Sequence, residues 1–155
     1  MWQRIQTVFL AIAVISLVLT IFTPIWVFED AAHGKIHKLY PMHYSIIENG
    51  QMTTTYFPYV VTAMLAAAAA TVAVIQIRKF KDRLLQIKLG AFNSILMAGT
   101  IGAAVVFATG FYKEFQGGQY SFGMYLPGVA VICNWLAMRF IRKDEKLVRD
   151  SDRLR

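Results

Sequence analysis

Residues 56–77 read YFPYVVTAMLAAAAATVAVIQI, an apolar run that contains no Asp, Glu, Lys or Arg. Its length is close to the ~20 residues that an α-helix needs to cross the hydrocarbon core of a bilayer. Three further apolar stretches lie at about residues 6–28, 85–112 and 122–141. All four are continuous rather than alternating, which favours helices over the strands of a membrane barrel. The sequence therefore predicts an all-α integral membrane protein with four transmembrane helices in a single domain, residues 1–155.

The composition supports this class. Of the 155 residues, 57% are hydrophobic and only 16% are charged, which is too apolar for a soluble domain of this length. The first apolar stretch ends in Trp26-Val27-Phe28 rather than at a site of small residues, unlike a cleavable signal peptide. We expect this stretch to stay attached as a transmembrane helix.

The distribution of Lys and Arg predicts the orientation in the membrane. Thirteen of the sixteen basic residues lie before the first apolar stretch, between the second and third or in the first turn of the third (Lys88), or from Arg139 onward. The other three are Lys35, Lys38 and Lys113. Cytoplasmic segments of membrane proteins carry the excess of basic residues. We therefore expect an N-in/C-in topology, with the loop between the second and third helices also in the cytoplasm.

The net charge of +7 follows from the same asymmetry. Basic residues on the cytoplasmic side of a membrane are attracted to anionic lipids. We expect the partners of this charge to be the lipid bilayer and the anionic lipids of its cytoplasmic face, and no nucleic acid. All seven tyrosines lie in or beside the two other loops, as in an aromatic belt at the outer interface.

The outer loop at residues 29–55 contains the dipeptide Asn49-Gly50, a strong signal for a β-hairpin turn, between two segments rich in β-forming residues. The second outer loop repeats the pattern around Gly117-Gly118. A single hairpin is marginally stable in water. We expect a small β-hairpin cap on the outer loops, in which the two loops pair into one sheet on the helix ends.

Small residues repeat at every fourth position in the third stretch, and such faces let membrane helices approach closely. They are Gly90, Ser94, Ala98 and Gly102. The second stretch is rich in alanine from Ala63 to Ala73. We expect the second and third helices to pack as a tight hairpin, although alanine is also an ordinary lipid-facing residue.

Two asparagines, Asn93 and Asn134, fall at similar depth in the third and fourth helices, with Gln6, Gln76 and Arg139 in the same direction. Polar groups in hydrocarbon need partners, and they sometimes mark a path for ions or protons. Hydrogen bonds between helices are the simpler interpretation. None of the residues in the middle of the spans is an acid or a histidine able to relay protons.

No catalytic motif is recognised, and we expect no enzymatic activity and no cofactor. Cys133 is the only cysteine, so no disulfide, redox pair or thiolate metal site is expected. The sequence contains no phosphate-binding glycine loop, no nucleophile elbow and no His-Glu-x-x-His helix. His33 and His37 have the spacing of metal ligands on a helix, but Gly34 between them disfavours a helix.

The C-terminal tail, residues 142–155, mixes acidic and basic residues. Glu145 and Arg149 have the i, i+4 spacing that favours a continuing helix. The tail is either a solvated helix end that fixes topology or a surface that docks another membrane or cytoplasmic protein. The candidate docking residues are Asp144, Glu145, Arg149 and Arg153.

Three segments carry a resemblance to a known family. They are residues 1–10, MWQRIQTVFL; residues 120–127, YSFGMYLP; and the run from Ile141 to Arg155. Together they resemble a family of uncharacterised four-span inner-membrane proteins of Bacteroidota, described only as a domain of unknown function. Trp2 and Met138 depart from the expected Ile and Asn. The resemblance implies a bacterial cytoplasmic membrane, and it supplies no activity or site residues.

Two functions of different class are compatible with these observations. The first is a non-catalytic accessory or scaffold protein of the inner membrane. The alternative is a small channel or transporter with a polar layer at Asn93 and Asn134. A water-accessible cavity reaching these asparagines would favour transport, whereas a solid bundle would favour partner binding.

Overall fold

The computed structural model describes residues 2–30, 33–80 and 82–153. It contains four long helices, α1 (Trp2–Phe22), α2 (Val60–Arg78), α3 (Arg83–Phe115) and α4 (Leu126–Arg153), and a short 3₁₀ helix, η1 (Phe122–Met124). In the described part of the chain, each of the four long helices is long and apolar enough to cross a membrane. Their outer surfaces expose large apolar side chains such as Ile95, Val106 and Ile132.

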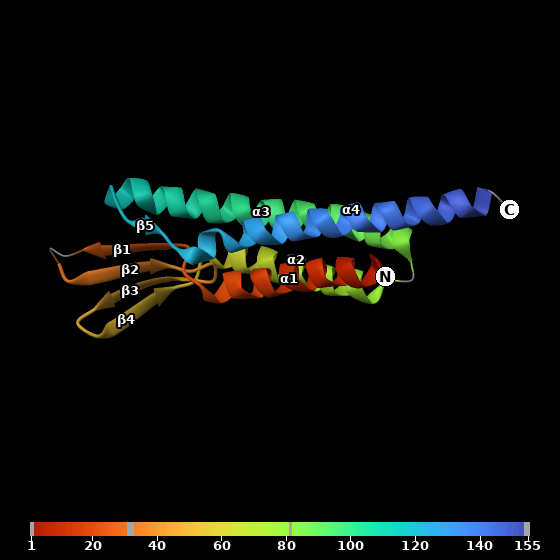
Figure 1. Cartoon of the computed structure of the whole chain (residues 1–155). Coiled ribbons are helices and arrows are strands. Elements are labelled where there is room, and N and C mark those ends of the chain that lie inside the picture. Colours follow the sequence, from red (N-terminus) through yellow and green to blue (C-terminus); the bar gives the residue numbers. More distant parts are fainter. Residues whose placement is uncertain (1, 31–32, 81, 154–155) are drawn as a thin grey trace.

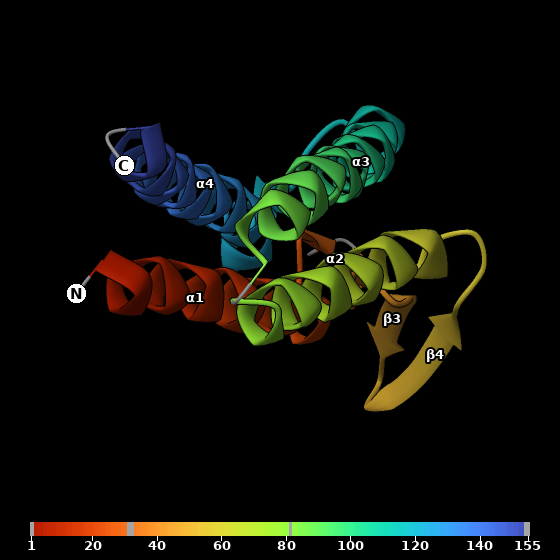
Figure 2. The same ribbon diagram turned by 90° about the vertical axis from the view of Figure 1, so that its right-hand side faces the viewer.

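The four helices form a bundle in which each helix packs against the next and α4 packs back against α1 (Figure 2). The core between them is built from alanines and a few larger residues, among them Leu17 and Met97. Asp82 caps the start of α3, where its carboxylate accepts a hydrogen bond from Leu85 N at 3.0 Å, and α2 and α3 pack side by side through a short turn.

Five strands form an antiparallel sheet at one end of the bundle (Figure 1). They are β1 (Trp26–Asp30), β2 (Lys35–Leu39), β3 (Tyr44–Glu48), β4 (Gln51–Thr55) and β5 (Gln119–Tyr120), in the order β4-β3-β2-β1-β5. The predicted all-α fold with a small hairpin cap is therefore wrong. The sheet is larger because every strand of the first loop pairs with its neighbour, and one of its faces is buried on α3.

The details of the two loops agree in part with the sequence analysis. The predicted hairpin turn at Asn49-Gly50 is confirmed, because β3 and β4 pair from Glu48 and Gln51 onward and both turn residues have positive φ. The pairing between the two loops is also present, since β5 pairs with β1. The prediction of a second hairpin is wrong, because α3 continues to Phe115 and Gln116 ends the helix in a left-handed conformation.

The first helix also ends earlier than the predicted stretch 6–28. The helix stops at Phe22, and Trp26-Val27-Phe28 belong to β1. Pro24 lacks the amide hydrogen that a continuing helix would need. Trp26 is fully buried against Phe28, Phe111 and Phe115, so its burial in the sheet stabilises the strand over the helix.

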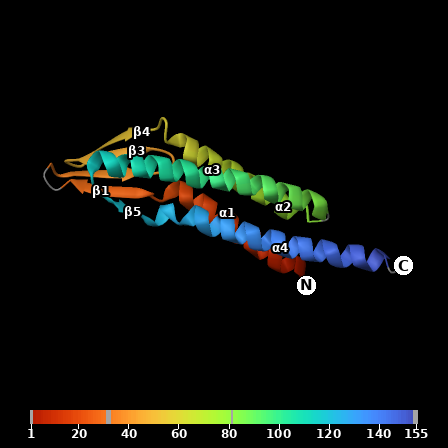
Figure 3. The ribbon, with the colours of Figure 1, turned by 90° about the horizontal axis from the view of Figure 1, so that it is seen from above.

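At the other end of the molecule lie the start of α1, the α2–α3 turn and the end of α4, hereafter the terminal end (Figures 1 and 3). Here α4 extends well past the other helices (Figure 3). At the sheet end it is α3 that continues past the bundle and runs alongside the strands (Figure 1). The chain thus has a helical centre with one extension at each end.

Candidate functional sites in the bundle and the sheet

Three of the residues singled out from the sequence come together near the terminal end of the bundle. The amide nitrogen of Asn134 in α4 donates to the backbone oxygen of Gly90 at 3.0 Å, and it lies 3.0 Å from the hydroxyl oxygen of Ser94. Both acceptors are in α3. These contacts join α3 to α4 through a side chain that is fully buried.

At Gly90, side chains from α2 and α4 come close to the backbone of α3. A Cβ atom at this position would lie 2.7 Å from both Cγ and Sδ of Met138, and 2.8 Å from Nε2 of Gln76. The absence of a side chain at Gly90 therefore allows α2, α3 and α4 to meet around one point of the backbone.

Ala98 and Gly102 do not share this contact. Both are exposed, whereas the buried face of α3 passes through Asn93, Met97 and Thr100. Steps of four residues exceed the 3.6 residues of a helical turn, so such a row drifts by about 40° per step around the helix. The predicted row of small residues in α3 therefore faces α4 at Gly90 and Ser94 and lies on the outside of the bundle at Ala98 and Gly102.

Asn93 is buried completely in the bundle, and within the described part of the chain neither its amide nitrogen nor its oxygen has a hydrogen-bond partner. The same holds for both amide atoms of Gln76 and for the amide oxygens of Gln6 and Gln86. Gln86 does donate to the backbone oxygen of Gln76 at 2.8 Å. Buried amides from all four helices thus form a polar region toward the terminal end.

These amides are neutral, and each offers both hydrogen-bond donors and acceptors. A water molecule or a small uncharged polar solute matches such a set, because one partner must both donate and accept at Asn93 and at Gln76. No acid or histidine is among them, so these side chains can form hydrogen bonds but cannot take up or release protons. Gln86 belongs to this group but did not stand out in the sequence.

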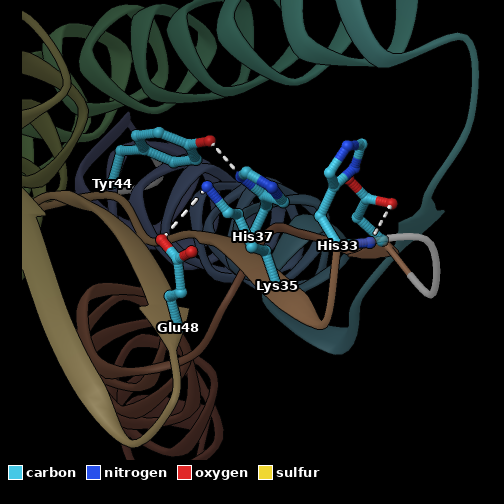
Figure 4. A network of polar contacts seen from close by, with 6 residues as sticks. His33, Lys35, His37, Tyr44 and Glu48 are labelled. Atoms are coloured by element: carbon cyan, nitrogen blue, oxygen red, sulfur yellow. Dashed lines mark hydrogen bonds and ion pairs between the residues drawn. The ribbon is translucent and has the colours of Figure 1, made fainter.

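The sheet end contains a second polar site, built on aromatic rings. Nδ1 of His37 in β2 lies 2.5 Å from the hydroxyl oxygen of Tyr44 in β3 (Figure 4). The His37 ring also contacts Phe115 of α3, with 4.6 Å between the ring centroids. Burial lowers the pKa of His37, although Asp30 and Glu114 act in the opposite direction. Burial also raises the pKa of Tyr44 to about 12, so the pair is held neutral.

Beside this pair, the face of the sheet is hollowed into a polar pocket of about 440 Å³. Lys35 and Glu48 in its lining form an ion pair at 3.0 Å (Figure 4), and the lining also includes His37 and Thr53. The pocket lining thus carries one positive and one negative side chain, and these two pair with each other.

Each of the three histidines has a different partner. His33 pairs with Asp30 at 2.7 Å on the surface, His37 contacts Tyr44, and the ring of His43 stacks on Tyr40. His33 and His37 do not share a helix face, because β2 begins at Lys35. Among the described residues, no group of three or more His, Cys, Asp or Glu side chains could hold a metal ion.

The C-terminal tail continues α4 as a helix, and two of its acids have partners within the chain. Asp144 pairs with Arg83 at the start of α3, with 3.2 Å between Oδ2 and Nη2. Glu145 and Arg149 form the predicted i, i+4 pair at 3.5 Å. Arg153 lies in the last turn of α4, but its side chain lies outside the described part. The contact from Asp144 to Arg83 could not be seen in the sequence, where the two residues are far apart.

Comparison with known proteins identifies the chain at the level of a family. A family model described as "Domain of unknown function (DUF4293)" matches residues 2–154, almost the whole length. No match was found among curated proteins.

Proposed function

We propose that this chain, which belongs to the DUF4293 family of unknown function, is a non-catalytic accessory or scaffold protein of a bacterial cytoplasmic membrane. In this proposal the four helices span the bilayer with both termini in the cytoplasm. The sheet then stands on the outer side, where the loops carry three of the sixteen basic residues. The protein's role in this proposal is to hold the sheet at a fixed position relative to the membrane, where a partner protein binds it.

The observation that supports this role most strongly is the continuity of α3 through both parts of the molecule. α3 is 33 residues long, which is longer than the ~20 residues that a span requires. Its last turns carry Phe111 and Phe115, whose rings pack against aromatic residues of the sheet, among them Trp26. A helix that begins in the bundle and ends against the sheet fixes the two as one rigid body.

The opposite face of the sheet offers a surface for a partner. Ile36, Ile47 and Met52 are cross-strand neighbours in β2, β3 and β4. Because strand residues alternate between faces, they point away from the face on which His37 meets α3. Met52 is 58% exposed. Apolar residues that are grouped on the face of the sheet away from α3 are typical of a protein interface.

Photo-crosslinking in intact cells tests the proposal. A crosslinking amino acid at Met52 is expected to give one adduct of defined mass, and Ile47→Lys should abolish it. The matched control is the same amino acid at Thr53, the next residue of β4, which is exposed on the other face. If Met52 and Thr53 give the same adducts, or neither gives one, the sheet is not a docking platform.

We propose the C-terminal tail as a second contact surface, in this case for a cytoplasmic or membrane protein. Since Asp144 is used within the chain, the test exchanges only the other pair, Glu145→Arg with Arg149→Glu, which keeps the net charge. Docking through charge complementarity predicts normal abundance in the membrane with loss of the co-purifying protein. An unchanged set of co-purifying proteins would leave the tail as a topology signal.

One observation favours the alternative of a small channel or transporter, namely the unpartnered amides of Asn93 and Gln76. Since Asn93 and Asn134 are 0% exposed, this structure is closed around them, which supports the scaffold. Reconstituted liposomes separate the two functions, with potassium ions and glycerol as the probes. Transport predicts a flux above that of empty liposomes that Asn93→Leu abolishes, and the scaffold predicts no such flux.

A further inference from the structure

A shallow hollow of about 250 Å³ lies on the side of α4 where the apolar part of the helix ends. It is lined by Trp135, Met138, Arg139 and Arg142. Their spacings of three and four residues place them on one face of the helix. Met138, which is 8% exposed, packs inward over Gly90 and forms the floor. Two guanidinium groups and an indole ring therefore surround a small cavity on the outside of the bundle.

Within the described ranges, neither arginine forms an ion pair. Arg83 pairs with Asp144 and Arg149 pairs with Glu145, whereas no carboxylate in the described ranges pairs with Arg139 or Arg142. The Arg139 guanidinium lies 5.7 Å from the centre of the Trp135 ring, a cation–π contact that holds it at the cavity. Unpaired guanidinium groups in such a position fit the oxygens of a phosphate group.

The surface that leads to this cavity is apolar. Val129 and Ile132 are exposed on α4, and Tyr125 is exposed just before its start. Steps of three or four residues continue this row to Trp135 and then to Arg139. The row is long enough to contact an acyl chain along its length. Its end in a tryptophan followed by arginines matches the change from hydrocarbon to headgroup at a membrane interface.

We propose that Arg139, Arg142 and Trp135 form a binding site for the phosphate group of an anionic phospholipid, whose acyl chain lies along Ile132 and Val129. The inference rests on the membrane placement proposed above and adds a specific lipid contact to it. The phosphodiester accepts hydrogen bonds from the guanidinium groups, and the indole ring lies at the level of the glycerol backbone. A lipid bound there would fix the depth of α4 at the cytoplasmic surface.

Native mass spectrometry of the full chain in detergent tests this site, with dioleoyl phosphatidylglycerol and phosphatidylcholine as the probes. We expect preferential binding of phosphatidylglycerol, and a loss of roughly thirtyfold in Arg139→Gln/Arg142→Gln, which is what two charges at about 1 kcal/mol each produce. Trp135→Leu should weaken binding less. The control Lys79→Gln/Lys88→Gln removes two exposed charges at the same end of the molecule and should bind as the unmodified chain does.

Equal binding by the two double variants would overturn the site, as would equal binding of the two lipids. Glycerol phosphate and inorganic phosphate separate the lipid from a free anion: if either competes as well as the intact lipid, the apolar row contributes nothing and the ligand is not a lipid. Membrane insertion is measured on the same variants. An unmodified chain that inserts normally but shows no preference for phosphatidylglycerol contradicts this inference alone, whereas failure of the unmodified chain to insert contradicts the proposed function.

Discussion

Arg83 and Asp144 join the start of α3 to the part of α4 that extends beyond the bundle. Nη2 of Arg83 lies 3.2 Å from Oδ2 of Asp144, and Nη1 donates to the backbone oxygen of the same residue at 3.0 Å. The two side chains are mostly buried, with exposures of 22% and 17%. One arginine thus holds both the side chain and the backbone of Asp144, which fixes the direction in which the tail leaves the bundle.

This double contact predicts different effects for two adjacent acids. Asp144→Ala keeps the backbone contact but leaves the mostly buried Arg83 guanidinium without its carboxylate partner, so it should lower the free energy of unfolding by about 1–3 kcal/mol. Glu145→Ala, whose partner Arg149 is largely exposed, should cost less than about 0.5 kcal/mol. Thermal unfolding in detergent measures both. Equal effects of the two substitutions would show that the Arg83 contact does not stabilise the protein.

The close contact at Gly90 predicts a second asymmetry. Gly90→Ala places a methyl group against Met138 and Gln76, both buried, and should destabilise the protein by about 1–3 kcal/mol through overpacking. Gly102→Ala is the control, because no atom lies within 4 Å of a Cβ built there, and the higher helix propensity of alanine should make it neutral or slightly stabilising. Met138→Ala should partly rescue Gly90→Ala. Equal stability of the two glycine variants would contradict the packing described here.

The four helices could be predicted from the sequence because each apolar run is nearly continuous, and length alone identifies such runs. The turn at Asn49-Gly50 was predictable because its signal is local. The extent of the sheet was not predictable. By composition alone, Trp26-Val27-Phe28 continues the first apolar stretch, and only its contacts with Phe111 and Phe115 show that it belongs to a strand. Those contacts are distant in the sequence, and they also explain why α3 continues to Phe115 instead of forming a second hairpin.

The candidate site was predictable to a similar degree. Asparagines stand out in apolar helices, so Asn93 and Asn134 could be identified. Their partners could not, because the contact from Asn134 to Gly90 depends on how α3 and α4 are rotated. The row of four-residue steps led to Ala98 and Gly102, which the drift of the helix carries to the surface. Gln86 and Arg83 lie in a basic, polar segment where neither residue is conspicuous.

The buried histidine predicts a loss of stability in mild acid. The pKa of His37 is lowered in the folded protein, chiefly by burial, while the unfolded chain has the ordinary pKa of about 6.5. The unfolded chain therefore binds more protons as the pH falls through about 6.5 toward the folded pKa, and stability is lost over that interval. His43 contributes in the same direction. The midpoint of thermal unfolding should decrease between about pH 8 and about pH 5.

Substitution identifies the group responsible. His37→Phe keeps a ring against Phe115 and removes the titration, so it should flatten the pH dependence, with His43 supplying what remains. A profile that is unaltered in His37→Phe would mean that another group controls the acid sensitivity.

Cysteine accessibility measures the placement of the sheet and the tail on opposite sides of a membrane. Asn49→Cys introduces a thiol at the β3–β4 turn, and Lys146→Cys introduces one on the exposed face of α4 beyond the bundle. The unmodified chain is the control, because Cys133 is buried. With a membrane-impermeant maleimide on intact spheroplasts, we predict labelling of Asn49→Cys at once and of Lys146→Cys only after the membrane is opened. Labelling of both thiols in intact spheroplasts, or of Lys146→Cys alone, would contradict a four-span protein that presents its sheet outside the cell membrane.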